Sequence, residues 1–215
     1  MFSYLIRCVL LGLSIYGNVQ LFVSKHTKEH ICIDSNCHYK FYTLLFNYVA
    51  IFALCLGLLK NIKIVRILHS FFMTIALSLE FGMLLIYCFI KYNFPNALLH
   101  ITNNQHFNLL IELSQYVFLF IACLMDPLCL IRAKLIISSI LFMFSFSHIA
   151  LICYFYKYHN LWIYDFLTTY DNIKRWYFFL VIILLPQLFY RFLLAFMPNN
   201  HNIKQIRKKN KEKKE

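Results

Sequence analysis

Six long apolar runs, separated by short polar segments, dominate the pattern of residues along the chain. The runs cover roughly residues 2–24, 41–59, 67–90, 107–125, 135–156 and 177–197, and charges or Pro and Asn close each of them. A helix of about 20 apolar residues spans the hydrocarbon core of a bilayer, because it satisfies its own backbone hydrogen bonds there. The pattern predicts an all-α, polytopic membrane protein: a bundle of six transmembrane helices in a single domain, residues 1–197, followed by a basic tail, residues 198–215.

Only the segment "DPLCLIRAK" separates the fourth run from the fifth. A merged or re-entrant pair of helices is therefore an alternative here, although Asp126 and Pro127 form a helix stop that two cations follow. The composition agrees with a membrane protein, since 61% of the residues are hydrophobic and only 14% are charged.

The cations predict the orientation of the bundle. An even number of spans puts both termini on one side, where the segment "KNIKIVR" and the tail "IKQIRKKNKEKKE" gather Lys and Arg residues, so we expect cytosolic termini. The net charge of +12 lies in loops and a tail that flank the membrane, which favours membrane lipids as partners over nucleic acid. Lys213 and Lys211 stand three and five positions from the end. This spacing resembles the dilysine signal of endoplasmic reticulum proteins, and it predicts residence in that membrane.

The cysteines do not form a disulfide scaffold, because six of the eight lie within or beside the apolar runs, where Cys acts as a small apolar residue. Cys32 and Cys37 lie in the first non-cytosolic loop together with His26, His30 and His38. A local disulfide, two free thiols and a zinc site are the alternatives, and the spacing fits no common zinc pattern. We expect neither a metal nor an organic cofactor.

Ionisable residues inside the apolar runs are candidates for function, because they are costly at that depth. They are Arg7, Glu80, Glu112, His148 and Arg191. Glu80 and His148 lie near the middle of the third and fifth runs, so they could form a hydrogen-bonded pair. The alternatives are a structural pair that fixes the helix packing, a protonated Glu80 that faces a polar cavity, and a proton relay in a transporter. The transporter is the weaker alternative, because the chain lacks internal repeats and interrupted helices.

Hydroxyl groups in the runs have an ordinary structural explanation. Ser138, Ser139, Ser145 and Ser147 form a stripe on the fifth run that is typical of helix packing. Thr43 stands at the start of the second run, where a threonine commonly caps the helix or bonds locally.

The stretch around Thr43 resembles a known family. "YKFYTLLFN", residues 39–47, is similar to the Trp-Lys-aromatic-x-Thr stretch at the start of the second span in the androgen-induced membrane protein family, with Tyr39 in place of the tryptophan. "NLWIYDFL", residues 160–167, resembles the family's Gly-x-Trp-Val-Tyr-Pro, with Asn160 and Asp165 in place of its Gly and Pro. The matching residues are Lys40, Phe41, Thr43, Trp162 and Tyr164.

Members of that family are integral-membrane hydrolases of fatty acid esters of hydroxy fatty acids, with a threonine nucleophile and a histidine partner. The resemblance implies that Thr43 is the nucleophile and that a fatty acyl ester is the substrate. It also implies a substrate-binding role for residues on the same membrane face, namely Lys40, Glu112, Trp162 and Tyr164. For Trp162 and Tyr164, an interfacial aromatic belt is the alternative.

The histidine that would activate Thr43 is not at the family's position. The family carries Asn-His-x-Met-His-Thr at the entry of the fourth span, where this chain reads "NNQHFNLLIELSQYVFLF", and the two possible alignments place Tyr116 or Ile111 at the partner position. A hydroxyl needs a base to become a nucleophile. His106 is our first candidate and His148 the second, because His148 lies about 12 Å below the end of its helix. A family member without catalysis, which binds lipid or a membrane partner, is the competing hypothesis. The oligomeric state is not predicted.

Overall fold

Helices make up the regular structure of the described residues in a computed structural model of the protein. It describes residues 2–27, 36–59, 61–94, 109–110, 113–125, 134–160, 162 and 166–196, with the backbone only for 2–4, 21–27, 36–44, 159 and 196. The predicted all-α class is confirmed for these residues. They form seven α-helices and one π-helical segment, which are α1 (Phe2–Thr27), α2 (Asn36–Leu58), α3 (Lys63–Asn93), η3 (Ser114–Phe118), α5 (Leu119–Met125), α6 (Lys134–His159), α7 (Phe166–Thr169) and α8 (Asn172–Phe196).

Three of these helices, α3, α6 and α8, are long and apolar enough to cross a membrane. The described apolar parts of the other segments are shorter, at Leu5–Gln20, Leu45–Leu58 and Ser114–Met125. Large apolar side chains face outward, such as Leu135 at 81% and Met143 at 70% exposure, while Asn47 and Glu80 are 1% and 0% exposed. Because lipid is as apolar as a protein core, this inverted distribution is that of a multi-pass membrane protein.

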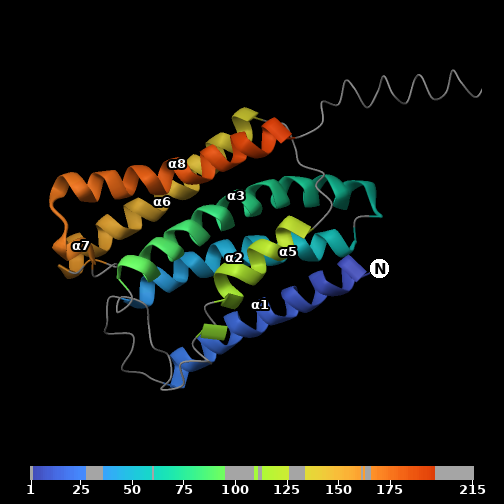
Figure 1. Ribbon diagram of the computed structural model, residues 1–215, viewed down its shortest axis with the longest axis horizontal. Coiled ribbons are helices and arrows are strands. Elements are labelled where there is room, and N and C mark those ends of the chain that lie inside the picture. Colours follow the sequence, from blue (N-terminus) through green and yellow to red (C-terminus); the bar gives the residue numbers. More distant parts are fainter. Residues whose placement is uncertain are drawn as a thin grey trace, which may run out of the picture.

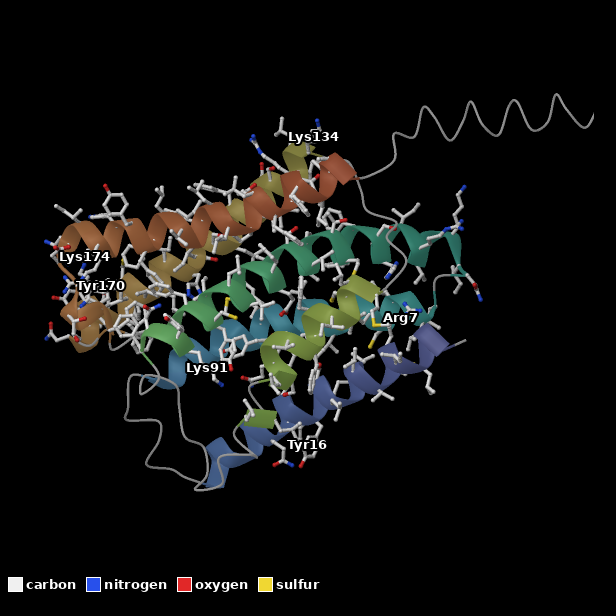
Figure 2. The ribbon with its side chains drawn as sticks, viewed as in Figure 1. Arg7, Tyr16, Lys91, Lys134, Tyr170 and Lys174 are labelled. Carbon is white, nitrogen blue, oxygen red and sulfur yellow. The ribbon has the colours of Figure 1, made fainter. Side chains whose placement is uncertain are left out.

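The helix α3 lies at the centre of the bundle. It contacts α2, η3, α5, α6 and α8, and α1 lies on the outside against η3, α5 and α2. Figure 1 shows that the start of α1 and the end of α8 lie at the same end of the molecule. In Figure 2, Arg7 and Lys134 lie toward this end, while Lys91 and Lys174 lie at the opposite end. The labelled cations therefore flank an apolar middle.

Two features let α3 pack on several sides. Its hydroxyl groups bond within the helix, since Ser70, Thr74 and Ser78 each donate to the carbonyl four residues earlier, at 2.9, 2.6 and 2.9 Å. Gly82 admits Pro186 of α8, because a Cβ at Gly82 would stand only 3.0 Å from Pro186 Cγ. Small residues at crossing points are typical of helix packing in membranes.

The helices extend beyond several of the predicted apolar runs. The helix α3 begins at Lys63 and ends at Asn93, against predicted bounds of 67 and 90, and α8 begins at Asn172 against 177. Helices continue through polar residues at a membrane interface, because the backbone keeps its hydrogen bonds there. The separation between the fourth and fifth runs, residues 126–133, lies outside the described part of the chain, as do the side chains of Cys32 and Cys37.

Candidate functional site

The residues singled out from the sequence fall into two groups. Thr43 and Lys40 lie in α2 near its start, with their side chains outside the described part of the structure. The others without a description are His106, Glu112 and Tyr164. His148 and Trp162 are described with their side chains, so the site is built from His148.

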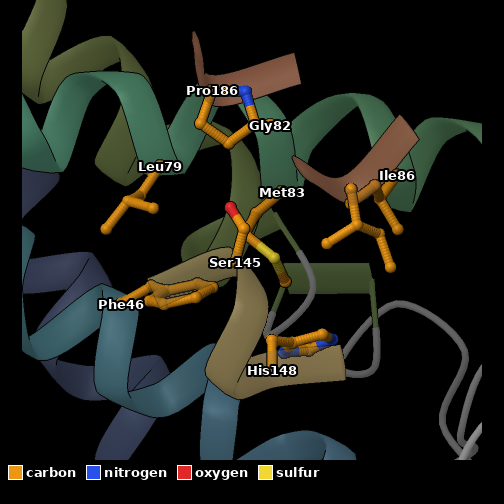
Figure 3. A pocket seen from close by; sticks show the side chains of 9 residues that line it. Phe46, Leu79, Gly82, Met83, Ile86, Ser145, His148 and Pro186 are labelled. Carbon is orange, nitrogen blue, oxygen red and sulfur yellow. The ribbon is translucent and has the colours of Figure 1, made fainter. Parts of the chain in front are cut away.

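His148 of α6 lines a small cavity and is only 3% exposed. Its ring stacks on Phe46 of α2, with ring centroids 6.2 Å apart and planes inclined by 28°. Figure 3 shows these two rings along one side of the cavity and Gly82 with Pro186 on another. The cavity is lined by Phe46, Leu79, Gly82, Met83, Ile86, Ser145, His148, Ile182 and Pro186, and its volume is about 10 Å³. This is roughly the volume that holds one water molecule.

Ser145 faces the same cavity as His148. The two residues are three positions apart on α6, so they lie on one side of the helix. Ser147 is exposed and donates to the Phe144 carbonyl at 3.0 Å, the local bond expected of a serine in a membrane helix. The serines of this stripe therefore differ, since Ser145 lines the cavity and Ser147 does not. The three-residue spacing of Ser145 and His148 was the feature of the sequence that could have predicted their common side of the helix.

The contact between His148 and Phe46 relates the imidazole to Thr43. Thr43 precedes Phe46 by three positions in α2, which is about 4.5 Å along the helix axis. His148 thus contacts α2 three residues after Thr43. His106, the first candidate from the sequence, lies outside the described residues.

A larger groove opens beside this cavity, between α3 and the start of α8. Its volume is about 630 Å³, and its walls are formed by Leu85, Ile86, Phe89, Tyr170, Lys174, Tyr177, Phe178, Val181 and Leu185. Ile86 also lines the cavity that contains His148. Lys174 and Tyr170 lie close together at one end of the molecule (Figure 2). An apolar groove with a cation at one end fits an amphiphile with an acyl chain and a polar head.

Trp162 takes part in a packed cluster at the end of the bundle. Its ring stacks on Tyr156 at 4.0 Å, and the guanidinium carbon of Arg175 lies 4.8 Å from the ring centroid. Arg175 also donates from Nε to the Leu167 carbonyl at 2.8 Å. Trp162 is 8% exposed and lines neither the cavity nor the groove described above. Its contacts join the end of α6 to the start of α8.

The structure places Glu80 against Asn47 and not against His148, with which its depth in the sequence allowed a hydrogen-bonded pair. Glu80 Oε1 lies 3.3 Å from the side-chain amide of Asn47, and its Oε2 has no hydrogen-bond partner in the described residues. Leu79, not Glu80, faces the cavity with His148. Successive helix residues point about 100° apart, so the two neighbours face different sides of the bundle.

The chain matches no family model, no curated protein and no solved structure. Within the part of the chain that the structure describes, no three His, Cys, Asp or Glu side chains gather as a metal site requires. The candidate site is therefore defined by its own geometry, with a histidine and a serine in a cavity beside an apolar groove.

Proposed function

We propose that this protein is an integral-membrane hydrolase of fatty acyl esters, in which Thr43 is the nucleophile and His148 is its general base. The observation that carries the proposal is the stacking of His148 on Phe46, one turn from Thr43 on α2. The resemblance to hydrolases of fatty acid esters of hydroxy fatty acids supplies the role of Thr43. The contact with Phe46 is the reason to propose His148, the second candidate from the sequence, as its partner.

The proposed reaction has two halves. The imidazole of His148 takes the proton of the Thr43 hydroxyl while the Thr43 oxygen attacks the ester carbonyl, and the imidazolium then protonates the leaving alcohol. Water activated by the same imidazole cleaves the acyl-threonine and regenerates the hydroxyl. A cavity of about 10 Å³ beside His148 suits one such water. The Ser145 hydroxyl, in the same cavity, is the candidate donor to the oxyanion.

The groove between α3 and α8 is the proposed site of the acyl chain. Its volume of about 630 Å³ and its apolar walls suit a long hydrocarbon chain. Lys174 at its margin has an exposed side chain, and its partner Asp171 lies 3.7 Å away. A free carboxylate of the ester substrate would compete with Asp171 for this cation. Ile86, shared by groove and cavity, lies where the chain would reach the catalytic groups.

The proposal includes six spans, cytosolic termini and residence in the endoplasmic reticulum membrane. Six spans are supported by the alternating direction of α1, α2, α3, η3 with α5, α6 and α8 in Figure 1. Both described chain ends lie at one end of the bundle, which an even number of crossings requires. A protein that carries an epitope after residue 215 should lie in the endoplasmic reticulum membrane, and the epitope should be accessible from the cytosol.

Hydrolysis of a panel of branched and simple fatty acyl esters by the purified protein tests the activity. Thr43→Val should abolish hydrolysis, and Thr43→Ser should retain part of it. His148→Gln should lower kcat by about 10²- to 10⁴-fold, the usual contribution of a general base. The matched control is His69→Gln, because His69 is equally buried at 3% but belongs to the first part of α3. Equal rates for wild type, Thr43→Val and His148→Gln would reject the mechanism.

A second candidate function is binding of a fatty acyl ligand without catalysis. The observation in its favour is the difference in size between the groove and the cavity, at about 630 and 10 Å³. Val181→Trp, which fills the groove, should then abolish retention of a labelled fatty acid. Leu184→Trp on the exposed side of α8 is the control. Binding that requires the groove, in a wild-type protein that hydrolyses no ester, would favour this candidate.

A further inference from the structure

Polar groups from four elements meet on another face of α3, away from the cavity with His148. They are the side chains of Asn18 on α1, Asn47 on α2 and Glu80 on α3, and the backbone carbonyl of Gln115 on η3. The three side chains are 4%, 1% and 0% exposed. Polar groups inside a membrane bundle are costly, and such groups mark candidate sites.

The depth of this cluster is near the middle of the bundle. Glu80 follows Lys63, the first residue of α3, by 17 positions and precedes Asn93, the last, by 13. At about 1.5 Å per residue, these ends are about 26 and 20 Å away. Asn47 is 11 positions from either end of α2. A charge at this depth would be far from water on both sides.

One hydrogen bond fixes the direction of all the others. Asn18 donates from Nδ2 to the backbone carbonyl of Ser14 at 2.8 Å. A carbonyl only accepts, so the amide nitrogen of Asn18 must point toward Ser14 and its Oδ1 must point away. Asn18 Oδ1 in turn accepts from Asn47 Nδ2 at 3.2 Å. The chain of donors therefore runs from Asn47 through Asn18 to Ser14.

The other end of the Asn47 amide then presents its oxygen to two further oxygens. The Glu80 Oε1 atom lies 3.3 Å from this end, and the carbonyl oxygen of Gln115 lies 3.2 Å from it. Neither a carboxylate nor a carbonyl can donate to an amide oxygen. With Glu80 ionised, three acceptors would face one another in a dry interior without a hydrogen between them.

Turning the amides over does not remove this conflict. If Asn47 alone turned, its nitrogen would serve Glu80 and Gln115, but its oxygen would then face Asn18 Oδ1 at 3.2 Å. If Asn18 turned as well, its oxygen would face the Ser14 carbonyl at 2.8 Å. With Glu80 ionised, each arrangement leaves at least one pair of acceptors in contact and keeps a charge on a side chain that is 0% exposed. A proton on the Glu80 carboxyl group removes this charge and makes the acid a donor to Asn47, so that only Asn47 Oδ1 and the Gln115 carbonyl oxygen stay in contact, at 3.2 Å.

We propose that Glu80 is a proton-binding site inside the membrane bundle, at which the neutral carboxyl group donates its proton to Asn47 Oδ1. The proton comes from water, and its release returns the carboxylate. In the protonated state every link has one donor and one acceptor, from Glu80 through Asn47 and Asn18 to the Ser14 carbonyl. The ligand of this site is a proton, and the site does not depend on the activity proposed for Thr43 and His148.

Gln115, whose backbone carbonyl lies at the cluster, carries a side-chain donor that an ionised Glu80 would need. Gln115 has a side-chain Nε2 without a hydrogen-bond partner among the described residues, and Gln115 is 7% exposed. After loss of the proton, this unused donor can turn to the carboxylate. Gln115 belongs to a π-helical segment, a form of helix that is often found at functional sites. Loss of the proton should therefore change the packing of η3 against α2 and α3.

Among the described residues, Glu80 Oε2 has no hydrogen-bond partner. Ionisable groups lie on the elements that pack against α3. The buried ones on the neighbouring elements are Tyr116 of η3, Cys123 of α5, His148 of α6 and Tyr190 of α8. The cation on α1, Arg7, is 11 positions from Asn18, about 16 Å along the helix. A proton, not a neighbouring cation, is thus the group that neutralises Glu80.

Infrared difference spectroscopy of the protein in lipid nanodiscs tests the proposal. At neutral pH the wild type should show the carbonyl stretch of a protonated carboxyl group, and Glu80→Gln should lack it. Asn47→Leu should keep the band and shift it, because the acceptor of the acid hydrogen is removed. Asp171→Asn is the control, since this exposed carboxylate pairs with Lys174 and should contribute nothing to the band. Identical spectra for wild type and Glu80→Gln would overturn the proposal.

Thermal unfolding in the same nanodiscs gives an independent measurement. Gln has the shape of the neutral acid and can donate to Asn47, so Glu80→Gln should keep the wild-type midpoint, whereas Glu80→Leu should lower it. Equal losses in both variants would overturn the proposal. The midpoint should not respond to sodium chloride in place of choline chloride. A sodium-dependent rise in the wild type that Glu80→Gln lacks would assign the site to a metal cation and also overturn it.

Discussion

The contact between Gly82 on α3 and Pro186 on α8 makes a strong prediction about packing in this bundle. A Cβ added at Gly82 would lie 3.0 Å from Pro186 Cγ and 3.3 Å from Pro186 Cδ. Carbon atoms prefer separations of about 3.5–4.0 Å, so Gly82→Ala must push the two helices apart by several tenths of an ångström. The proline ring is closed on its own backbone and cannot rotate out of the way.

Two opposing effects set the magnitude for Gly82→Ala. Alanine in place of glycine within a helix stabilises by about 0.5–1 kcal/mol, while an extra methyl group in a packed core costs about 1–3 kcal/mol. We therefore expect a net destabilisation of about 1 kcal/mol. Gly12 on α1 offers the matched control, because no atom lies within 4 Å of a Cβ built there. Gly12→Ala should therefore show only the gain from alanine in place of glycine within a helix, and it should be slightly more stable than wild type.

Reversible unfolding of the purified variants in mixed micelles measures the difference. We expect Gly82→Ala to lie about 1–3 kcal/mol below Gly12→Ala, which isolates the cost of the contact. Pro186→Ala in the Gly82→Ala background should recover part of the loss, and the double-mutant cycle gives the coupling between the two sites. If Gly82→Ala were as stable as Gly12→Ala, the close approach of α3 and α8 would be wrong.

Three further predictions use the same unfolding measurement. Asn47→Ala should destabilise by about 1–3 kcal/mol, because it leaves buried polar groups without a partner. Arg175→Lys should cost about 1 kcal/mol, since an ammonium group cannot both cover the Trp162 ring and donate as the guanidinium does. Gln187→Leu should cost roughly 0.6–1.7 kcal/mol, because the Gln187 amide donates to the Ser138 carbonyl on α6 at 2.8 Å.

Each of these variants has a control on the exposed surface. Asn93→Ala removes an exposed hydrogen bond within α3, from the Asn93 side-chain amide to the Phe89 carbonyl. Lys174→Ala removes an exposed ion pair with Asp171, at 3.7 Å. Both should change stability by less than about 0.5 kcal/mol. Losses in the controls equal to those of Asn47→Ala and Arg175→Lys would contradict the view that burial makes the difference.

The positions of the helices along the chain could be predicted from the sequence. Which face of each helix is buried and which is exposed could not. Every described long helix lies over a predicted apolar run, because a run of that length has no other stable form in a membrane. Because the membrane is as apolar as the protein interior, hydropathy does not show which face of a helix is buried. Leu135 and Leu77 are equally apolar, yet the first is 81% exposed and the second is fully buried. Lipid and protein interior both accept leucine, so hydropathy does not separate them.

The candidate site shows the same limit. His148 was identified as a costly residue at mid-depth, but its neighbour could not be found without the packing, and the structure sets it against Phe46 rather than Glu80. Asn18 and Asn47 were not singled out, because a search for ionisable groups passes over uncharged amides. Their signal was available in the sequence as two asparagines well inside apolar runs.

Depth and packing order together decide which polar groups meet. Glu80 lies near mid-depth on the central helix, so by depth alone it could face Asn47 on one side or His148 on the other. Leu79 and Met83 turn toward α6 and His148, and the rotation of about 100° per residue then directs Glu80 toward α1 and α2. The apolar residues of α3 thus separate a histidine cavity from a carboxyl site. In the two proposals made above, this separation keeps the His148 imidazole and the Glu80 carboxyl group apart, so that neither group neutralises the other.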